Sequence, residues 1–219
     1  MSPRLLVAAS LVALLAATGV ADASIIAYTS PAGTVGNQKY GFTVGMDFVP
    51  KFSVDVTALG LFSSTGKGFS GTDHAVLFDG VTHAILATSQ FSVSSPGTLA
   101  PGTSDFFKAL VIPVRLAAGH EYTIAAFMPT DFIANSGISG APPIESGIAD
   151  ISYVGLGRYA TSGGRNTFPT VIDNGPANRY SGPTFAFVKV PEPASTVALG
   201  IGLLGLFAFA RAGKDASRA

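Results

Sequence analysis

Three histidines, His74, His83 and His120, are the side chains best suited to metal chemistry in a chain that has no cysteine. Zinc sites usually show two of their ligands a few positions apart in the chain. None of the three histidines has another histidine at i+2 or i+4. We therefore expect them to be surface or turn residues, and the sequence predicts neither a metal nor a cofactor.

Four aspartates could supply oxygen ligands or acid–base groups, namely Asp47, Asp73, Asp79 and Asp105. Each stands alone, without the D-x-D-x-D-G run that surrounds calcium in a single loop, so a calcium ion would need ligands from separate loops. The sequence also lacks a G-x-S-x-G segment that would expose a nucleophilic serine. Spacing alone nominates no pair of carboxylates for glycoside hydrolysis. The expectation is a protein without catalytic residues, that is, not an enzyme.

A group of aromatic residues offers a different chemistry, the binding of sugars: Tyr153, Tyr159, Phe168 and Tyr180. Exposed rings can stack on a sugar, and Arg158, Arg165 and Asn178 lie close by in the chain to donate hydrogen bonds. Aromatic residues of β-sandwiches also form the core. Exposed rings would favour carbohydrate binding, and buried rings would favour packing alone.

The elements that would position these residues are short strands between Ser24 and Lys189. Apolar residues recur there with a period near two, and the runs are interrupted by Gly, Pro, Asn and Asp. Phe52, Val54 and Val56 alternate with polar residues, Leu59 and Leu61 lie on either side of Gly60, and these apolar residues should face the core. Two apolar runs in 74–87 flank Asp79-Gly80, which predicts a hairpin with a type I′ turn.

The remaining strands are expected at 39–44, 90–93, 106–116, 121–128, 150–156 and 184–190. Pro113 should lie at an edge or a bulge because it cannot donate to a ladder. The segments 129–145 and 161–181 are rich in turn-forming residues and are expected to be long loops. The fold class predicted is an all-β, antiparallel β-sandwich of residues 24–189.

The amino-terminal 23 residues have the pattern of a cleaved signal peptide. A basic Met1–Arg4 precedes an apolar run, and Ala21 and Ala23 form a small-x-small cleavage site before Ser24. An uncleaved anchor is the alternative, but the run is short for one. The folded part should then lie outside the cytoplasm.

The carboxyl-terminal segment, 190–219, has three parts. A motif at 190–195 comes first, and its residues are Val190, Pro191, Glu192, Pro193, Ala194 and Ser195. An apolar run at 196–210 predicts a transmembrane helix of only about 22 Å, shorter than the hydrocarbon core of roughly 30 Å. The basic tail 211–219 contains Arg211, Lys214 and Arg218, and its charge favours a cytoplasmic end. A plain membrane anchor after a proline-rich linker is the alternative.

Two other features of the sequence exclude further classes of function. The G-x-G-x-x-G at 200–205 lies inside the apolar run, without the strand and helix that a dinucleotide site needs. Between Ser24 and Lys189, acidic and basic residues are nearly equal in number and scattered, so no nucleic-acid partner is expected.

The order of motif, apolar helix and basic tail resembles the PEP-CTERM sorting signal of Gram-negative bacteria. This resemblance implies that an exosortase, a membrane transpeptidase-like enzyme, is the partner that reads the signal and processes the chain. Proteins of this kind are commonly associated with exopolysaccharide and biofilm matrix. The implied location is the inner membrane before processing, and the cell surface or extracellular matrix afterwards.

The middle of the chain resembles the jelly-roll-type domain found in such exported proteins. The segments that carry this resemblance are Ala58–Gly60, His74–Phe78 and Leu116–Tyr122. It implies a jelly-roll-like sandwich and no established catalytic residues. The expectation is an exported, non-enzymatic surface or matrix protein, and the alternative is a secreted carbohydrate-binding module or carbohydrate-active enzyme with the same signal.

Overall fold

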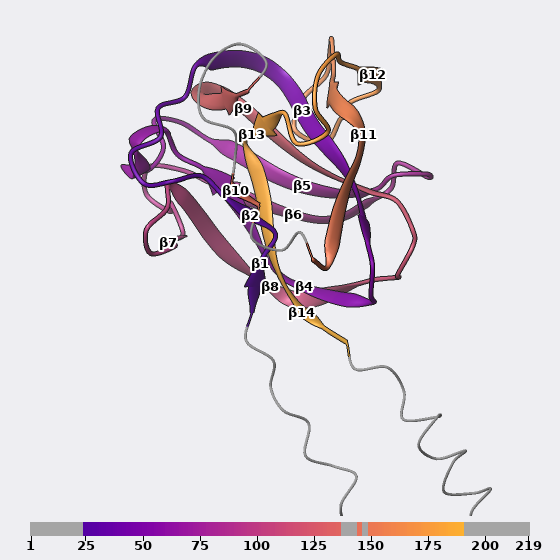
Figure 1. The fold of residues 1–219 in the computed structure, drawn as a ribbon. Helices are drawn as coiled ribbons and strands as arrows, with labels where there is room; N and C mark the ends of the chain where they lie inside the picture. Colours follow the sequence, from indigo (N-terminus) through magenta and orange to yellow (C-terminus); the bar gives the residue numbers. More distant parts are fainter. Residues whose placement is uncertain (1–23, 137–143, 146–148, 191–219) are drawn as a thin grey trace, which may run out of the picture.

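A computed structural model describes residues 24–136, 144–145 and 149–190, and this part of the chain is all-β (Figure 1). Its strands pair in antiparallel fashion throughout, and one short 3₁₀ helix, η2 (Ser64–Gly66), interrupts them. Within these residues no helix has the length and apolar character to cross a membrane. The predicted signal peptide, transmembrane helix and basic tail lie outside the described residues.

Most of the strands belong to two sheets. The larger sheet has the order β12 (Val171–Ile172), β11 (Ile151–Tyr159), β3 (Gln38–Pro50), β9 (Tyr122–Asn135), β5 (Asp73–Asp79) and β6 (Ile85–Phe91), with β13 (Tyr180–Ser181) paired to β9. The smaller sheet has the order β1 (Ile25–Ile26), β14 (Pro183–Lys189), β4 (Val54–Phe62), β8 (Asp105–Leu116) and β7 (Thr98–Leu99). A separate pair joins β2 (Tyr28–Thr29) and β10 (Ile144–Glu145).

The main core lies between the two sheets. The ring centroids of Phe48, from β3, and Phe185, from β14, are 4.7 Å apart, so the sheets contact each other directly. Four residues predicted to face the core are fully buried, and a bulge at Thr57 accounts for the change from even to odd positions in β4: Val54, Val56, Leu59 and Leu61. The described domain is therefore consistent with a β-sandwich.

Phe52 does not join this core, and the prediction for it is wrong. Its side chain is 45% exposed, and the ammonium group of Lys189 lies 5.5 Å from the ring centroid. Phe52 precedes the first residue of β4, Val54, and lies in the connection from β3. Strict alternation applies only inside a strand, so it does not determine the side of a residue in the connecting turn.

A second, smaller core covers the outer face of the larger sheet. It consists of Val76 and Phe78 from β5, Ala125 from β9, and Phe168 from the connection after β11. The segment 161–170 therefore crosses this face, and β5 is buried on both sides. The expected long loop at 161–181 is present, with the short strands β12 and β13 inside it.

The predicted hairpin of β5 and β6 forms, but its turn is not type I′. Gly80 is absent from the positive-φ residues, and His83 has the left-handed conformation instead, with φ 61°. The amide of His83 donates to the carbonyl of Asp79 at 3.0 Å, which closes a longer turn. Gly80 is required for another reason: a Cβ there would lie 2.9 Å from the carbonyl oxygen of Glu121.

Two prolines lie at irregularities in long strands. Between Ala109 and Val114, β8 carries extra residues opposite β4, which confirms the bulge expected at Pro113. The expected loop at 129–145 is wrong in its first part, because β9 continues past Pro129 to Asn135. A shift of register in the pairing of β9 with β3 accommodates this proline.

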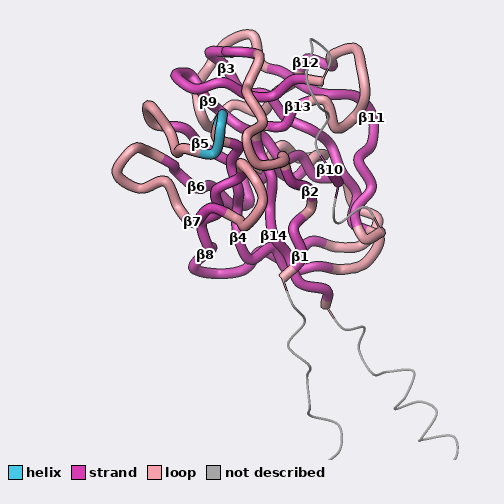
Figure 2. The backbone as a smooth tube through the Cα atoms, turned by 60° about the vertical axis from the view of Figure 1, so that its left-hand side comes forward, coloured by secondary structure: helices cyan, strands magenta, loops and turns pink. Residues whose placement is uncertain are grey.

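The two ends of the described domain lie at the same end of the sandwich (Figures 1 and 2). β1 begins one residue after Ser24 and pairs with β14, with Ile25 opposite Phe187. β14 ends at Lys189, and the amide of Val190 donates to the carbonyl of Ser53 at 2.9 Å. The chain therefore enters and leaves the sandwich through neighbouring strands.

Candidate functional site

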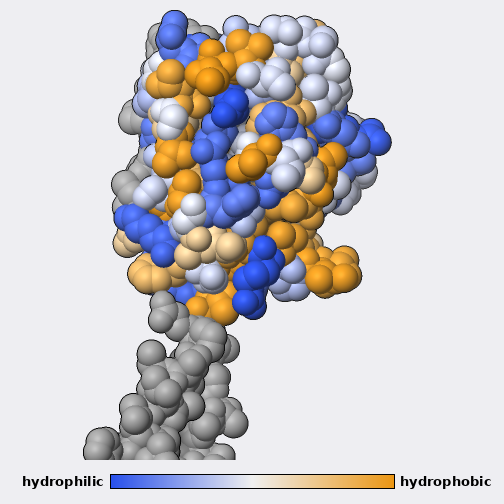
Figure 3. Space-filling model, turned by 90° about the vertical axis from the view of Figure 1, so that its right-hand side faces the viewer, coloured by the Kyte–Doolittle hydropathy of each residue, from blue (hydrophilic) through white to orange (hydrophobic). Residues whose placement is uncertain are grey.

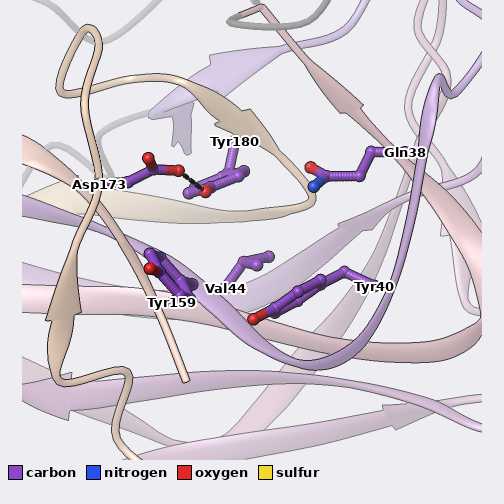
Figure 4. A pocket seen from close by; sticks show the side chains of 6 residues that line it. All are labelled: Gln38, Tyr40, Val44, Tyr159, Asp173 and Tyr180. Carbon is purple, nitrogen blue, oxygen red and sulfur yellow. Dashed lines mark hydrogen bonds between the residues drawn. The ribbon is translucent and has the colours of Figure 1, made fainter. Parts of the chain in front are cut away.

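A small cavity of about 160 Å³ lies at one end of the larger sheet (Figure 4). Three of its six lining residues are tyrosines, and the full set is Gln38, Tyr40, Val44, Tyr159, Asp173 and Tyr180. Figure 4 shows Tyr40, Val44 and Tyr159 on one side, and Asp173, Tyr180 and Gln38 on the other. The cavity is therefore lined by rings and by polar groups that face one another.

The pairing of β3 with β11 sets the position of the two rings on the first side. Tyr159 lies opposite Val44 in this pairing, and Tyr40 precedes Val44 on the same strand. The rings of Tyr40 and Tyr159 meet edge to face, with centroids 6.1 Å apart. The hydroxyl of Tyr40 donates to the carbonyl of Ala160 at 2.7 Å. These contacts hold Tyr40 in place at the wall of the cavity.

On the opposite side, Asp173 connects two side chains. It accepts a hydrogen bond from the hydroxyl of Tyr180, and its other oxygen lies 3.1 Å from Nη1 of Arg179. Burial, followed by the hydrogen bond to Asp173, raises the pKa of Tyr180 above its ordinary value. Burial and then the neighbouring Tyr159 also raise the pKa of Tyr40. Both phenols are therefore neutral at physiological pH.

Of the four aromatic residues expected to contact sugar, the structure brings two to this cavity, Tyr159 and Tyr180. Tyr153 instead packs edge to face on Tyr28 at 5.8 Å, against the main core. Phe168 is buried on the outer face of the larger sheet. Neither Tyr153 nor Phe168 reaches the cavity, and Tyr180, which does, is itself buried in the main core.

The sequence did not predict four residues of this cavity, Gln38, Tyr40, Val44 and Asp173. Gln38 and Tyr40 share the parity of Val44, so alternation along β3 was the signal that could have found them. Asp173 lies in the loop-rich segment that was considered, but its contact with Tyr180 depends on how that segment folds back. Half of the cavity comes from β3, which is distant in the chain from the aromatic residues near the loop.

The side chains of the three histidines contact different partners. His83 stacks on Phe168 with centroids 3.7 Å apart, and Nε2 of His120 lies 2.8 Å from Oδ2 of Asp79. His74 is buried on β5, where burial and then the charge of Arg165 lower its pKa. In the described ranges, no group of three or more His, Cys, Asp or Glu side chains is arranged to hold a metal ion.

His74 and Arg165 also line a second, open cavity of about 430 Å³ on the outer face of the larger sheet. Phe127 lies at its side, and residues 164–167 complete the lining. The ring centroids of His74 and Phe127 are 6.5 Å apart. The cavity is shallow and mostly open, and its lining supplies a single cation and no carboxylate.

Two of the four aspartates have clear structural partners. Asp47 accepts hydrogen bonds from Oγ1 of Thr123 at 2.6 Å and from Nε of Arg158, which fixes three strands of the larger sheet to one another. Asp79 accepts from the amide of Thr82 at 2.7 Å. This hydrogen bond is the largest effect that lowers the pKa of Asp79 to about 2. Both carboxylates stabilise the fold.

The other two aspartates are buried and short of partners. Oδ2 of Asp105 accepts from the amide of Ser30 at 2.6 Å, and burial raises the pKa of Asp105 to about 7. Asp73 is fully buried, and no donor of the described residues reaches either of its oxygens. Burial, and then the carboxyl of Asp131, raise the pKa of Asp73 to about 8. Asp73 therefore carries a proton at neutral pH.

The sorting motif begins where the described structure ends. Val190 is held by Ser53 at the end of β14, and residues 191–219 lie outside the described residues. Residues 189–212 match the family model described as the PEP-CTERM protein-sorting motif. No curated protein matches the chain. The chain thus carries, directly after a β-rich domain, a segment that matches the PEP-CTERM protein-sorting motif.

Proposed function

We propose that this chain is a non-enzymatic protein of the cell surface or of the exopolysaccharide matrix, delivered there when an exosortase processes its carboxyl-terminal signal. The observation that carries this proposal is the match at residues 189–212, which starts at the last residue of β14. The matched segment thus overlaps the folded domain only at Lys189 and Val190. An enzyme can bind the signal without disturbing the sandwich.

The residues of the signal support recognition by a membrane enzyme. Pro191 and Pro193 lack an amide donor and disfavour helix in their neighbours, so they favour an extended strip before the apolar run. Glu192 is the only charge in this strip. The run that follows is short for a permanent membrane anchor. An extended, singly charged strip at the membrane surface is a suitable substrate for a transpeptidase-like enzyme.

Processing can be tested by intact-mass measurement of the protein recovered from its native host. We expect the wild-type protein to lack its carboxyl-terminal residues, and the variant Pro191→Ala/Glu192→Ala/Pro193→Ala to retain them through Ala219. A matched control, Pro142→Ala/Pro143→Ala/Glu145→Ala, removes the same residue types elsewhere and should be processed like the wild type. If the wild-type protein and the first variant both extend to Ala219, processing at this signal is refuted.

We also propose a jelly-roll topology for the sandwich. Eight strands form the jelly roll, and in chain order they are β1, β3, β4, β5, β6, β8, β9 and β14. If they are numbered 1 to 8 in this order, the smaller sheet contains strands 1, 8, 3 and 6 side by side. The larger sheet contains strands 2, 7, 4 and 5. This interleaving of two sheets is the order of an eight-stranded jelly roll. β7, β11 and β12 then extend the two sheets at their edges.

The second candidate function is carbohydrate binding at the tyrosine-lined cavity. The rings of Tyr40 and Tyr159 offer faces or edges for stacking, and Gln38 and Asp173 offer polar atoms opposite them. The volume of about 160 Å³ is smaller than that of typical ligand pockets, roughly 300–1,000 Å³. The cavity would therefore take a single sugar unit or a branch of a polysaccharide rather than a long chain.

Binding to the host exopolysaccharide tests this second candidate. Removing the ring in Tyr159→Ala should weaken binding about tenfold, the effect of losing roughly 1.4 kcal/mol of ring contact. Tyr153→Phe is the control, since Tyr153 lies against Tyr28 and outside the cavity. Retained affinity in Tyr159→Ala, measured by isothermal titration or by pull-down with the polysaccharide, would exclude this site.

A further inference from the structure

The most exposed apolar side chains of the described domain are two neighbours in β8. Val111 is 99% exposed and Ile112 is 77% exposed. They lie in the bulge between Ala109 and Val114, where extra residues of β8 lose their partners in β4. Because both branched side chains project into water, they add no packing contacts to the core. These side chains therefore call for a partner outside the domain.

The bulge lies near the end of the sandwich where the chain leaves toward its membrane segment. Lys189 of β14 and Leu116 of β8 both pair with Val54, and the bulge begins opposite Thr57. Thr57 lies three residues along β4 from Val54, so the bulge begins about 10 Å from the level of Lys189. Figure 3 shows apolar side chains gathered over the lower part of the domain, including a group that projects outward there.

Phe52 lies at the same end of the sandwich. It precedes β4 by two residues and is 45% exposed beneath the ammonium group of Lys189. Lys189 is also paired with Asp150 at 2.7 Å, and Arg115, beside the bulge, with Asp55 at 2.5 Å. Both of these cations are thus paired with a carboxylate. A surface of apolar side chains next to neutralised cations suits the interfacial zone of a bilayer better than a polyanion.

The length of the chain limits how far this end can lie from the membrane. Only residues 191–195 separate Val190 from the apolar run that starts at Thr196. Five fully extended residues span at most about 18 Å. As long as the carboxyl-terminal segment is anchored, the end of the sandwich that carries Val190 is therefore held close to the headgroups. A tilt of the domain brings the bulge to the bilayer.

We propose that Val111, Ile112 and Phe52 form a membrane-contact surface that seats the folded domain on the bilayer before the signal is processed. The inference rests on the anchored precursor of the proposed function. The partner that this surface contacts is the interfacial zone of the lipid bilayer. Seating the domain would fix the orientation in which the strip 191–195 is presented to the processing enzyme.

The test uses the absence of tryptophan from the chain, so that Ile112→Trp introduces a single indole. The full-length variant is reconstituted into phosphatidylcholine and phosphatidylglycerol vesicles, with and without brominated acyl chains. We expect at least about a twofold loss of emission with brominated lipid, because an indole prefers the membrane interface. Val35→Trp is the matched control, since Val35 is 65% exposed and precedes the opposite end of β3. Its emission should change little.

The outcomes separate this proposal from the one on which it rests. Equal emission in both lipids for Ile112→Trp, in protein that still floats with the vesicles, overturns the contact surface and leaves the anchor intact. Protein that does not float with the vesicles refutes the anchored precursor and with it this inference. An indole shielded from acrylamide but not quenched by brominated lipid indicates contact with a second protein copy, which also overturns the proposal. Val111→Trp repeats the test should Ile112→Trp unfold, as judged by near-ultraviolet circular dichroism.

Discussion

Replacing Asp73 by asparagine should make the protein more stable at pH 8 and remove most of the loss of stability that the wild type shows between pH 4 and pH 8. Asp73 is fully buried, and its pKa is raised to about 8 by burial and then by the carboxyl of Asp131. Asp131 accepts hydrogen bonds from the amide of Ser70 at 2.9 Å and from its Oγ. Asp131 thus stays ionised, and the proton resides on Asp73.

The direction of the pH dependence follows from the two pKa values of Asp73. In the unfolded chain Asp73 releases its proton near pH 3.8, whereas the folded protein retains it up to about pH 8. Between these values the folded state binds more protons, so the free energy of unfolding falls as the pH rises. A shift of this size corresponds to at most about 6 kcal/mol. Asp105, with a pKa of about 7, adds a smaller fall in the same direction.

Urea unfolding of the purified chain at pH 5, 7 and 8, followed by tyrosine fluorescence, measures this effect. The amide of asparagine can donate to Asp131 in place of the acid proton, so Asp73→Asn should keep the contact without the titration. Asp55→Asn is the control, because Asp55 pairs with Arg115 at the surface and should leave the slope unchanged. A wild-type stability that stays level or rises from pH 5 to pH 8 would contradict the prediction.

Replacing Phe185 by alanine should lower the free energy of unfolding by about 3–5 kcal/mol. Phe185 has no exposed surface, and its ring lies 4.7 Å from that of Phe48 and 5.9 Å from that of Phe187. The side chain joins the two sheets at the centre of the sandwich. Its loss leaves a cavity that rigid strands on both sides cannot close.

The same urea measurements test this prediction. Phe185→Leu retains much of the volume and should cost clearly less than Phe185→Ala. Phe52→Ala provides the matched control for removing a phenyl ring, because Phe52 is 45% exposed and should cost less than about 1 kcal/mol. Similar losses for Phe52→Ala and Phe185→Ala would show that Phe185 does not carry the contact between the sheets.

The sequence alone was sufficient for features that depend on local pattern. The apolar positions of β4 placed Val54 and Val56 in the core, and Pro113 marked a bulge, because side-chain direction and the missing proline donor are properties of a few adjacent residues. The sorting signal was recognisable for the same reason. Its proline motif, apolar run and basic tail are consecutive in the chain.

Features that depend on strand register were decided by the tertiary structure. Tyr40 and Tyr159 meet because β3 pairs with β11, and Asp73 meets Asp131 because β5 pairs with β9. A register shift of one residue would turn each of these side chains to the other face of its sheet. Local periodicity specifies which residues share a face, but it carries no information about which residue of a distant strand lies opposite. The composition of the cavity and the protonation of Asp73 therefore became visible only in the folded chain.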